Sequence, residues 1–138
     1  MSTGPGPVKI LFVCVGNTCR SQMGEGFARF YGDGKVEVRS AGTAASGSVN
    51  RSTIEAMKEI GIDISDQTSK QLTGDMLDWA DVVVTMGCRS ATELCPVTYR
   101  GQKYDWKIDD PLGRPWEFMQ IVRDGIEEKV KGLISAQT

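Results

Sequence analysis

The stretch VKILFVC at residues 8–14 is a nearly continuous apolar run of strand length. Such a run, without apolar and polar alternation, is typical of a strand buried on both faces of a parallel sheet. The run ADVVVTMG at residues 80–87 repeats the pattern, and we expect a turn at Gly87. Parallel strands need crossover connections, so both runs predict helices packed over the sheet.

Helical periodicity fills the segments between and after these runs. Apolar residues recur at helical spacing in SQMGEGFARFYG at 21–32, in NRSTIEAMKEIG at 50–61 and after Pro115. In the second segment, Ser52 and Glu55 form a capping-box pattern. KVEVRSAG at 35–42 and YDWKIDDP at 104–111 are expected to be short extended pieces.

This alternation predicts the fold class. A chain of 138 residues with 40% hydrophobic and 25% charged side chains suits one domain with a substantial core. We expect a single-domain, three-layer α/β/α fold with a central, mainly parallel four-stranded sheet. Residues 1–7 are expected to be a flexible lead, and residues 8–135 the domain.

Charge and leader patterns exclude several classes of protein. The formal net charge is -2 and like charges form no block, so we expect neither nucleic acid nor membrane as a partner. The start MSTGPGP has neither the basic nor the apolar part of a signal peptide. We therefore expect a cytoplasmic protein, in which the four cysteines are reduced working thiols. We also expect a monomer.

The stretch CVGNTCRS at residues 14–21 lies where the first expected strand ends and the first expected helix begins. A loop of this length, with Gly16 and Asn17 able to adopt left-handed backbone angles, can turn successive N–H groups inward and bind a tetrahedral oxyanion. The helix start and a forked contact from Arg20 add positive charge. The sequence therefore predicts a Cys-X5-Arg phosphate-binding loop, whose oxyanion-binding residues are Val15, Gly16, Asn17, Thr18, Cys19 and Arg20.

Cys14 lies at the base of this loop, where the features that hold an anion also favour a thiolate. The chain has no histidine, so Cys-His and Ser-His pairs are excluded, and a thiolate activated by the loop needs neither. An inert core cysteine is the plain alternative for Cys14. A zinc site of Cys14, Cys19, Cys88 and Cys95 is disfavoured, because their spacing does not match short zinc knuckles. We expect no metal and no cofactor, and we interpret Cys19 as a buried or auxiliary thiol.

Four segments in order, VCVGNTCRSQMGEGFAR, RSAG, VVVTMGC and DDP, resemble the low-molecular-weight protein tyrosine phosphatase family, especially its arsenate reductase branch. The resemblance runs from about Val8 to the last helix. It implies that Cys14 is the nucleophile, that Arg20 clamps the anion and that the Ser21 hydroxyl supports the thiolate. It also implies that Asp110, directly before Pro111, is the general acid.

The assignment of Asp110 has a second argument. A leaving oxygen must be protonated, and a carboxyl group before a proline is held with little backbone freedom. Asp109 is the neighbouring alternative, and a solvated acidic turn is the commoner fate of such a pair.

Cys88 and Cys95 distinguish a reductase from a phosphatase. Reducing arsenate to arsenite takes two electrons from thiols, and the spacing of these cysteines resembles the relay pair of the arsenate reductases. Leu112 and Gly113 follow Asp-Pro, where the phosphatase branch tends to carry tyrosine. In the implied relay, Cys14, Cys88 and Cys95 act in turn, and thioredoxin or a low-molecular-weight thiol reduces the final disulfide.

Geometry adds a condition to this relay. In a continuous helix, residues 88 and 95 would be about 10 Å apart, whereas a disulfide needs their Cα atoms within about 7 Å. We therefore expect the segment between them to unwind. Met86 and Gly87 separate Thr85 from Cys88, unlike in the thioredoxin-coupled members, so the electron donor stays open.

The resemblance also concerns a potassium site. Some family members bind potassium through an Asn, Glu, Ser and Asp set, to which Asn17, Glu25 and Ser40 correspond. The fourth position is Lys70, whose ammonium group could replace the ion against Glu25. A solvated surface lysine is the alternative.

Three functions follow from the sequence. Arsenate reduction is the first, phosphate monoester hydrolysis by a tyrosine phosphatase is the second, and a non-catalytic thiol redox sensor is the third.

Overall fold

A four-stranded sheet forms the centre of the computed structural model, which describes residues 6–87, 90–95 and 98–138. The strand order is β2-β1-β3-β4 and these pairings are all parallel. The strands are β1 Val8–Cys14, β2 Val36–Gly42, β3 Val82–Met86 and β4 Gln102–Trp106. The helices are α1 Arg20–Gly32, α2 Arg51–Glu59, α3 Gly74–Trp79, α4 Ala91–Leu94 and α5 Trp116–Gln137. The predicted single-domain α/β fold is confirmed.

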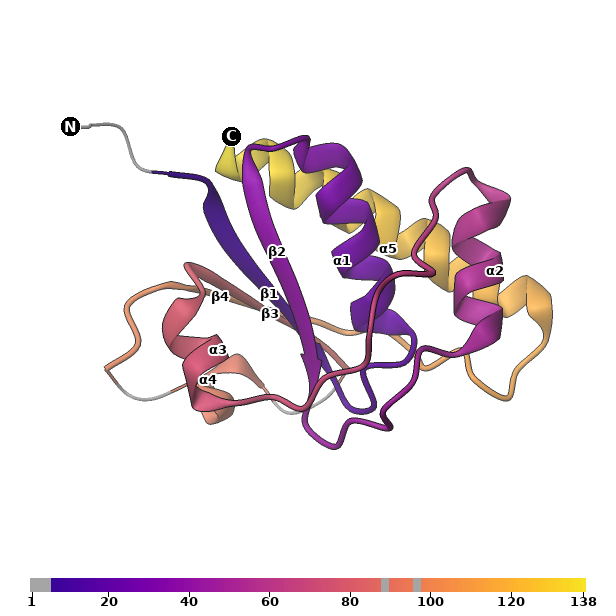
Figure 1. Ribbon diagram of the computed structural model, residues 1–138, viewed down its shortest axis with the longest axis horizontal. Coiled ribbons are helices and arrows are strands. Elements are labelled where there is room, and N and C mark those ends of the chain that lie inside the picture. Colours follow the sequence, from indigo (N-terminus) through magenta and orange to yellow (C-terminus); the bar gives the residue numbers. More distant parts are fainter. Residues whose placement is uncertain (1–5, 88–89, 96–97) are drawn as a thin grey trace.

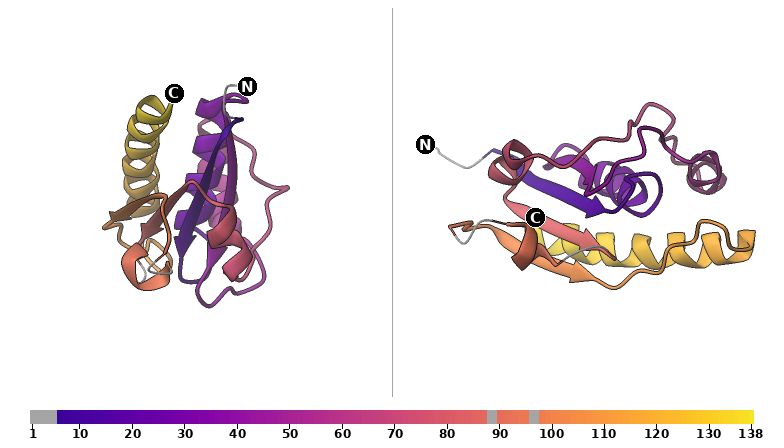
Figure 2. Two further views of the ribbon diagram at one scale, coloured as in Figure 1. Left: turned by 90° about the vertical axis from the view of Figure 1, so that its left-hand side faces the viewer. Right: turned by 90° about the horizontal axis from the view of Figure 1, so that it is seen from below.

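Alternate side chains of β1 enter two different cores. Ile10, Phe12 and Cys14 pack with α1, α2 and α5, whereas Leu11 and Val13 pack with α3 and α4. Ile10, Phe12, Leu11 and Val13 have no exposed surface, and burying such a side chain fully is worth about 1.5–3 kcal/mol. The strand is thus buried on both faces, as its continuous apolar run predicts. Figures 1 and 2 show α5 beside α1 and extending past the sheet to α2.

The register places the functional end of the molecule. Cys14 pairs with Gly42 and Met86 pairs with Trp106, so all four strands end at one edge. Loops at this edge lie at the lower end of the sheet in Figure 1. Ligands of open α/β sheets bind outside the carboxyl ends of the strands, so this edge is where a site is expected.

Some local predictions were wrong. Asn50, not Ser52, caps α2, since its side chain accepts a hydrogen bond from the Ser52 N–H and Ser52 lies inside the first turn. The Ser52 and Glu55 capping box is therefore absent, and Glu55 pairs with Arg51 at 3.7 Å. The short helices α3 and α4 were not predicted. β4 begins at Gln102, ahead of the expected extended piece.

Across the part of the chain that the structure describes, none of the helices combines the length and the apolar character needed to span a membrane.

Candidate active site

The loop between β1 and α1 has its carbonyl groups turned outward. The carbonyl oxygens of Cys14, Val15, Gly16 and Thr18 accept hydrogen bonds from backbone N–H groups of residues 43–50, at 2.9–3.1 Å. The Asn17 carbonyl accepts from the Gln22 side chain at 2.9 Å. In a trans peptide, each following N–H points the opposite way. The loop therefore turns its N–H groups toward the inside, as an anion-binding nest requires.

Two backbone features fix the shape of this loop. Asn17 has φ 51°, the left-handed conformation that was expected of it. At Gly42, a Cβ atom would lie 2.4 Å from the Val15 carbonyl oxygen and 2.9 Å from the Asn17 nitrogen. Only glycine allows the end of β2 to approach the loop so closely.

A cavity of about 280 Å³ lies inside the loop and brings together Cys14, Arg20 and Asp110. Its lining residues are Cys14, Val15, Gly16, Thr18, Cys19, Arg20, Asp110 and Leu112. Of the predicted oxyanion-binding residues, only Asn17 does not line the cavity. Its side chain points away from the cavity and hydrogen-bonds Ser21 and Ser40. Asp109 does not line the cavity, so the geometry favours Asp110 over its neighbour.

A buried hydrogen-bond chain leads to the Cys14 sulfur. The Asn17 side-chain amide donates to Ser21 Oγ at 2.7 Å and to Ser40 Oγ at 3.0 Å, and the Ser40 hydroxyl donates to Glu25 Oε1 at 2.5 Å. Ser21 Oγ therefore already accepts a hydrogen bond, and its own hydrogen is free for Cys14 Sγ at 2.9 Å. A Cys14 thiolate has no hydrogen, so in that state Ser21 is the donor, and a donated hydrogen bond stabilises the thiolate.

Arg20 links the loop to the segment that carries Asp110. It is 7% exposed, and its Nη1 donates to the Ile108 carbonyl at 2.9 Å. Its Nε is buried and has no hydrogen-bond partner among the described residues. Buried donors are rarely left unpaired, so this nitrogen fits a guanidinium shaped to receive an anion.

Asp110 lies at the open side of the cavity. The Leu112 N–H donates to its Oδ1 at 3.0 Å, and the residue is exposed. An exposed carboxyl group at the mouth of the cavity can exchange protons with water and reach a leaving oxygen.

Cys19 is a second thiol in the cavity wall, but a different one from Cys14. Burial raises the pKa of Cys19 to about 12. Its sulfur lies 3.8 Å from the Met119 sulfur. Cys19 is therefore a protonated packing thiol, in agreement with its interpretation as a buried or auxiliary residue.

Of the predicted relay cysteines, Cys14 and Cys95 lie on opposite faces of the sheet. Cys88 lies outside the described residues. Cys95 is 6% exposed and packs in the core on the α3 and α4 face, whereas Cys14 belongs to the core on the opposite face. A single zinc ion cannot bind both thiolates in this arrangement.

Lys70 lies beside Glu25. Its Nζ is 3.8 Å from Glu25 Oε1, it hydrogen-bonds the Thr68 carbonyl, and Arg29 holds the other Glu25 oxygen at 2.7 Å. Burial lowers the pKa of Lys70, and the Glu25 carboxylate opposes this shift. Two cationic side chains already neutralise Glu25, so these residues do not fit a bound potassium ion.

We expect activity to be the same within about twofold when potassium replaces sodium at constant ionic strength. The positive charge beside Glu25 comes from the Lys70 and Arg29 side chains and not from an ion of the solution. Initial rates in the two chloride salts measure this. Lys70→Ala should lower the rate and gain potassium dependence. A large potassium activation of the unaltered protein would contradict the interpretation.

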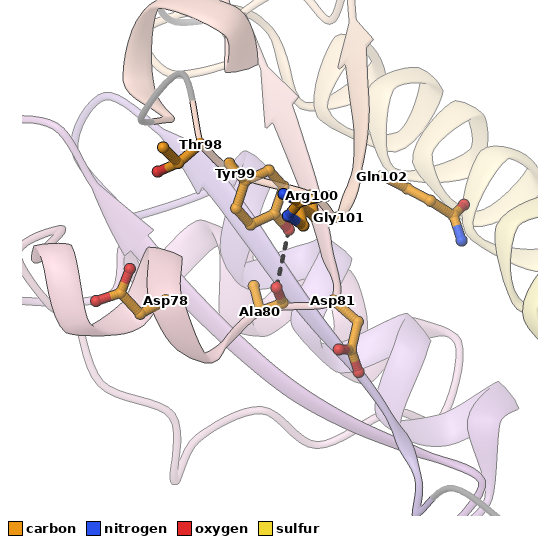
Figure 3. Close-up of a pocket in the computed structure, with 8 residues that line it drawn as sticks. All are labelled: Asp78, Ala80, Asp81, Thr98, Tyr99, Arg100, Gly101 and Gln102. Carbon is orange, nitrogen blue, oxygen red and sulfur yellow. Dashed lines mark hydrogen bonds between the residues drawn. The ribbon is translucent and has the colours of Figure 1, made fainter.

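A larger pocket, about 560 Å³, lies at the opposite end of the sheet (Figure 3). Asp78, Asp81 and Arg100 are among its lining residues, and the Tyr99 hydroxyl donates to the Ala80 carbonyl at 2.8 Å. The described residues that line it include no cysteine, and its polar groups do not converge on one point in Figure 3. We therefore place the chemistry at the smaller cavity.

Sequence reasoning missed two residues of the site. Gly87, expected only as a turn, has φ 89°, and a Cβ atom there would lie 2.1 Å from Arg20 Nη1. Ile108 contributes a backbone carbonyl, for which no side-chain signal exists. The position of Gly87 directly before Cys88 was the available signal.

Comparisons with known proteins agree with this geometry. Arsenate reductase 1 of Bacillus cereus is 47% identical over 123 residues, covering 88% of this chain and 90% of that protein. An arsenate reductase structure in the phosphate-binding state has 39% identity and a TM-score of 0.81, covering 95% of this chain and 99% of that one. A thioredoxin-dependent arsenate reductase of Corynebacterium glutamicum has 29% identity and a TM-score of 0.83, covering 98% of this chain and 64% of that one.

The family described as low molecular weight phosphotyrosine protein phosphatase matches residues 9–138. The match covers the strands, the Cys-X5-Arg loop and the final helix. Together with the four-stranded parallel sheet and the cavity around Cys14, it shows that the chain belongs to the low molecular weight phosphotyrosine protein phosphatase family.

Proposed function

We propose that this protein reduces arsenate to arsenite through a relay of Cys14, Cys88 and Cys95. The observation that carries the proposal is the cavity in which Cys14, Arg20 and Asp110 meet. A tetrahedral oxyanion suits its inward N–H groups and its arginine. The relatives named arsenate reductase support arsenate as the anion.

The first step uses the cavity residues. The Cys14 thiolate attacks the arsenic atom of bound arsenate, and Asp110 gives a proton to the departing oxygen, which leaves as water. The product is a Cys14–arsenic(V) adduct. The Ser21 hydroxyl stabilises Cys14 before the attack, and Arg20 holds the remaining oxygens.

Two thiol transfers follow. The Cys88 thiolate attacks the Cys14 sulfur, and the S–As electron pair stays on arsenic, so arsenite leaves as the Cys14–Cys88 disulfide forms. The Cys95 thiolate then attacks the Cys88 sulfur, and Cys14 leaves as a thiolate. The resulting Cys88–Cys95 disulfide carries the two oxidising equivalents.

An external thiol donor must reduce this disulfide. We propose thioredoxin as the donor, supported by the thioredoxin-dependent relative, with a low-molecular-weight thiol as the alternative. We also propose that the protein acts as a monomer in the cytoplasm, a compartment in which thiols are kept reduced.

Hydrolysis of phosphate monoesters is the second candidate, favoured by the same cavity and by the family match. It needs Cys14 as nucleophile, Arg20 as clamp and Asp110 as acid, but neither Cys88 nor Cys95. The two functions therefore separate by mutation.

The test compares Cys14→Ser, Cys88→Ser and Cys95→Ser in two assays. Arsenate-dependent NADPH oxidation with thioredoxin and its reductase should vanish in all three variants. Aryl phosphate hydrolysis should vanish only in Cys14→Ser. Arsenate turnover with thioredoxin by Cys88→Ser would contradict the relay, and phosphatase activity without arsenate turnover in the unaltered protein would favour the second candidate.

A further inference from the structure

Cys95 is buried in this structure, a state called here its closed position. It follows α4 directly as the C-cap residue, and its surroundings are the apolar side chains of the α3 and α4 core. Burial raises the pKa of the Cys95 thiol, Lys103 opposes that shift and Asp105 adds to it. In this position the Cys95 side chain is only 6% exposed, and its raised pKa favours the protonated thiol.

The helix that carries Cys95 is too short to be stable by itself. α4 spans Ala91–Leu94, and isolated helices are marginal even at about 12–15 residues. Ser90 and Glu93 cap it locally, each bonding the backbone N–H of the other. Contacts with the sheet must therefore supply part of its stability.

Asp105 of β4 makes such a contact. Its Oδ1 accepts from the Ala91 N–H at 2.8 Å, at the first residue of α4. The same oxygen accepts from the buried Thr85 hydroxyl at 2.5 Å, across the β3 and β4 register. One carboxylate thus joins two strands to the start of the helix, where its negative charge is also favourable.

The chain is anchored on both sides of this helix. Before it, Gly87 lies against the Arg20 guanidinium. After it, the Tyr99 hydroxyl donates to the Ala80 carbonyl, as Figure 3 shows, and burial raises the pKa of Tyr99 to about 12. Between these anchors, the Asp105 hydrogen bond acts directly on the helix that positions Cys95.

We propose that Asp105 is a positioning residue of the relay, whose hydrogen bond to Ala91 holds α4 on the sheet and keeps Cys95 buried until α4 is released. Release lets the Cys95 thiol lose its proton and attack the Cys88 sulfur of the Cys14–Cys88 disulfide. A Cys88–Cys95 bond forms, and Cys14 leaves as a thiolate. This role in the relay rests on the proposed function, whereas the closed position of Cys95 does not.

Pulse alkylation of the reduced, full-length protein with iodoacetamide tests the proposal, with Cys95 followed by peptide mass spectrometry. Asp105→Ala should be alkylated at Cys95 about tenfold faster, the effect of losing one hydrogen bond to a charged group. Asp105→Asn keeps an acceptor oxygen for Ala91 and should stay within about twofold of the unaltered protein. Unchanged alkylation in Asp105→Ala would overturn the proposal, as would equal acceleration in Asp105→Asn.

Thr85→Val is the matched control, because it removes the other hydrogen bond of Asp105 and leaves Ala91 paired. It should not accelerate alkylation, and equal acceleration would show that general weakening of the sheet exposes Cys95. Aryl phosphate hydrolysis, which needs only the cavity residues, should be unchanged in Asp105→Ala. Alkylation needs no arsenate, so failure of the positioning role and failure of arsenate reduction give different results.

Discussion

Gly87→Ala is expected to lower kcat/KM for arsenate and for an aryl phosphate by at least about 100-fold, the cost of losing one strong oxyanion contact. A Cβ atom at this position would lie 2.1 Å from Arg20 Nη1 and 2.7 Å from the Ile108 carbonyl oxygen. The Ile108 oxygen is backbone and yields little, so the guanidinium must move. Steady-state kinetics on both substrates measure the effect, and the phosphate ester reports on Arg20 without the relay.

Gly34→Ala is the matched control for backbone strain. Gly34 has φ 82°, close to the 89° of Gly87, but nothing lies within 4 Å of its added Cβ atom. Both variants should lose about 1–2 kcal/mol of stability from the left-handed conformation. Only Gly87→Ala should lose activity, and equal activity in the two variants would show that Gly87 does not position Arg20.

Asn17→Ala is expected to lower the free energy of unfolding by about 3 kcal/mol, since buried partners left unpaired cost about 1–3 kcal/mol each. Its side chain donates to Ser21 and Ser40 and accepts from the Lys70 N–H at 2.8 Å, with no exposed surface. Without it, the Ser21 hydroxyl is no longer directed at Cys14. Both activities should therefore fall at least about tenfold.

Urea unfolding and steady-state kinetics measure this prediction. Asp33→Ala is its control, because Asp33 also has a positive φ, 42°, but is exposed at the end of α1. The control should lose only the cost of the backbone conformation and keep its activity. An Asn17→Ala protein as stable as Asp33→Ala would contradict the role of the buried amide.

The sequence was most informative where local pattern and packing agree. Continuous apolar runs predicted β1 and β3, and helical periodicity predicted α1, α2 and α5. The helices α3 and α4 were missed because they span only six and four residues and depend on contacts with other segments. Thr73 caps α3, but a short capped turn has the same local pattern as a loop.

The candidate site was partly predictable for a similar reason. Its loop is continuous in sequence, so Cys14, Asn17 and Arg20 could be assigned from spacing and backbone preference. The contact of Arg20 with Ile108 and the placement of Cys95 across the sheet arise from tertiary packing between distant segments. Such packing leaves no periodic or motif signal in one sequence.

The hydrogen bonds that the carbonyl groups of the Cys14 loop accept from residues 43–50 affect how well the loop can distinguish one anion from another. Since the loop is held by its own backbone contacts, its donors are preorganised and do not reshape around each ligand. Arsenate and phosphate present nearly the same tetrahedron and charge to such a rigid receptor. Under the proposed function, discrimination between these anions must therefore come after binding, in the step where only arsenic accepts two electrons from sulfur.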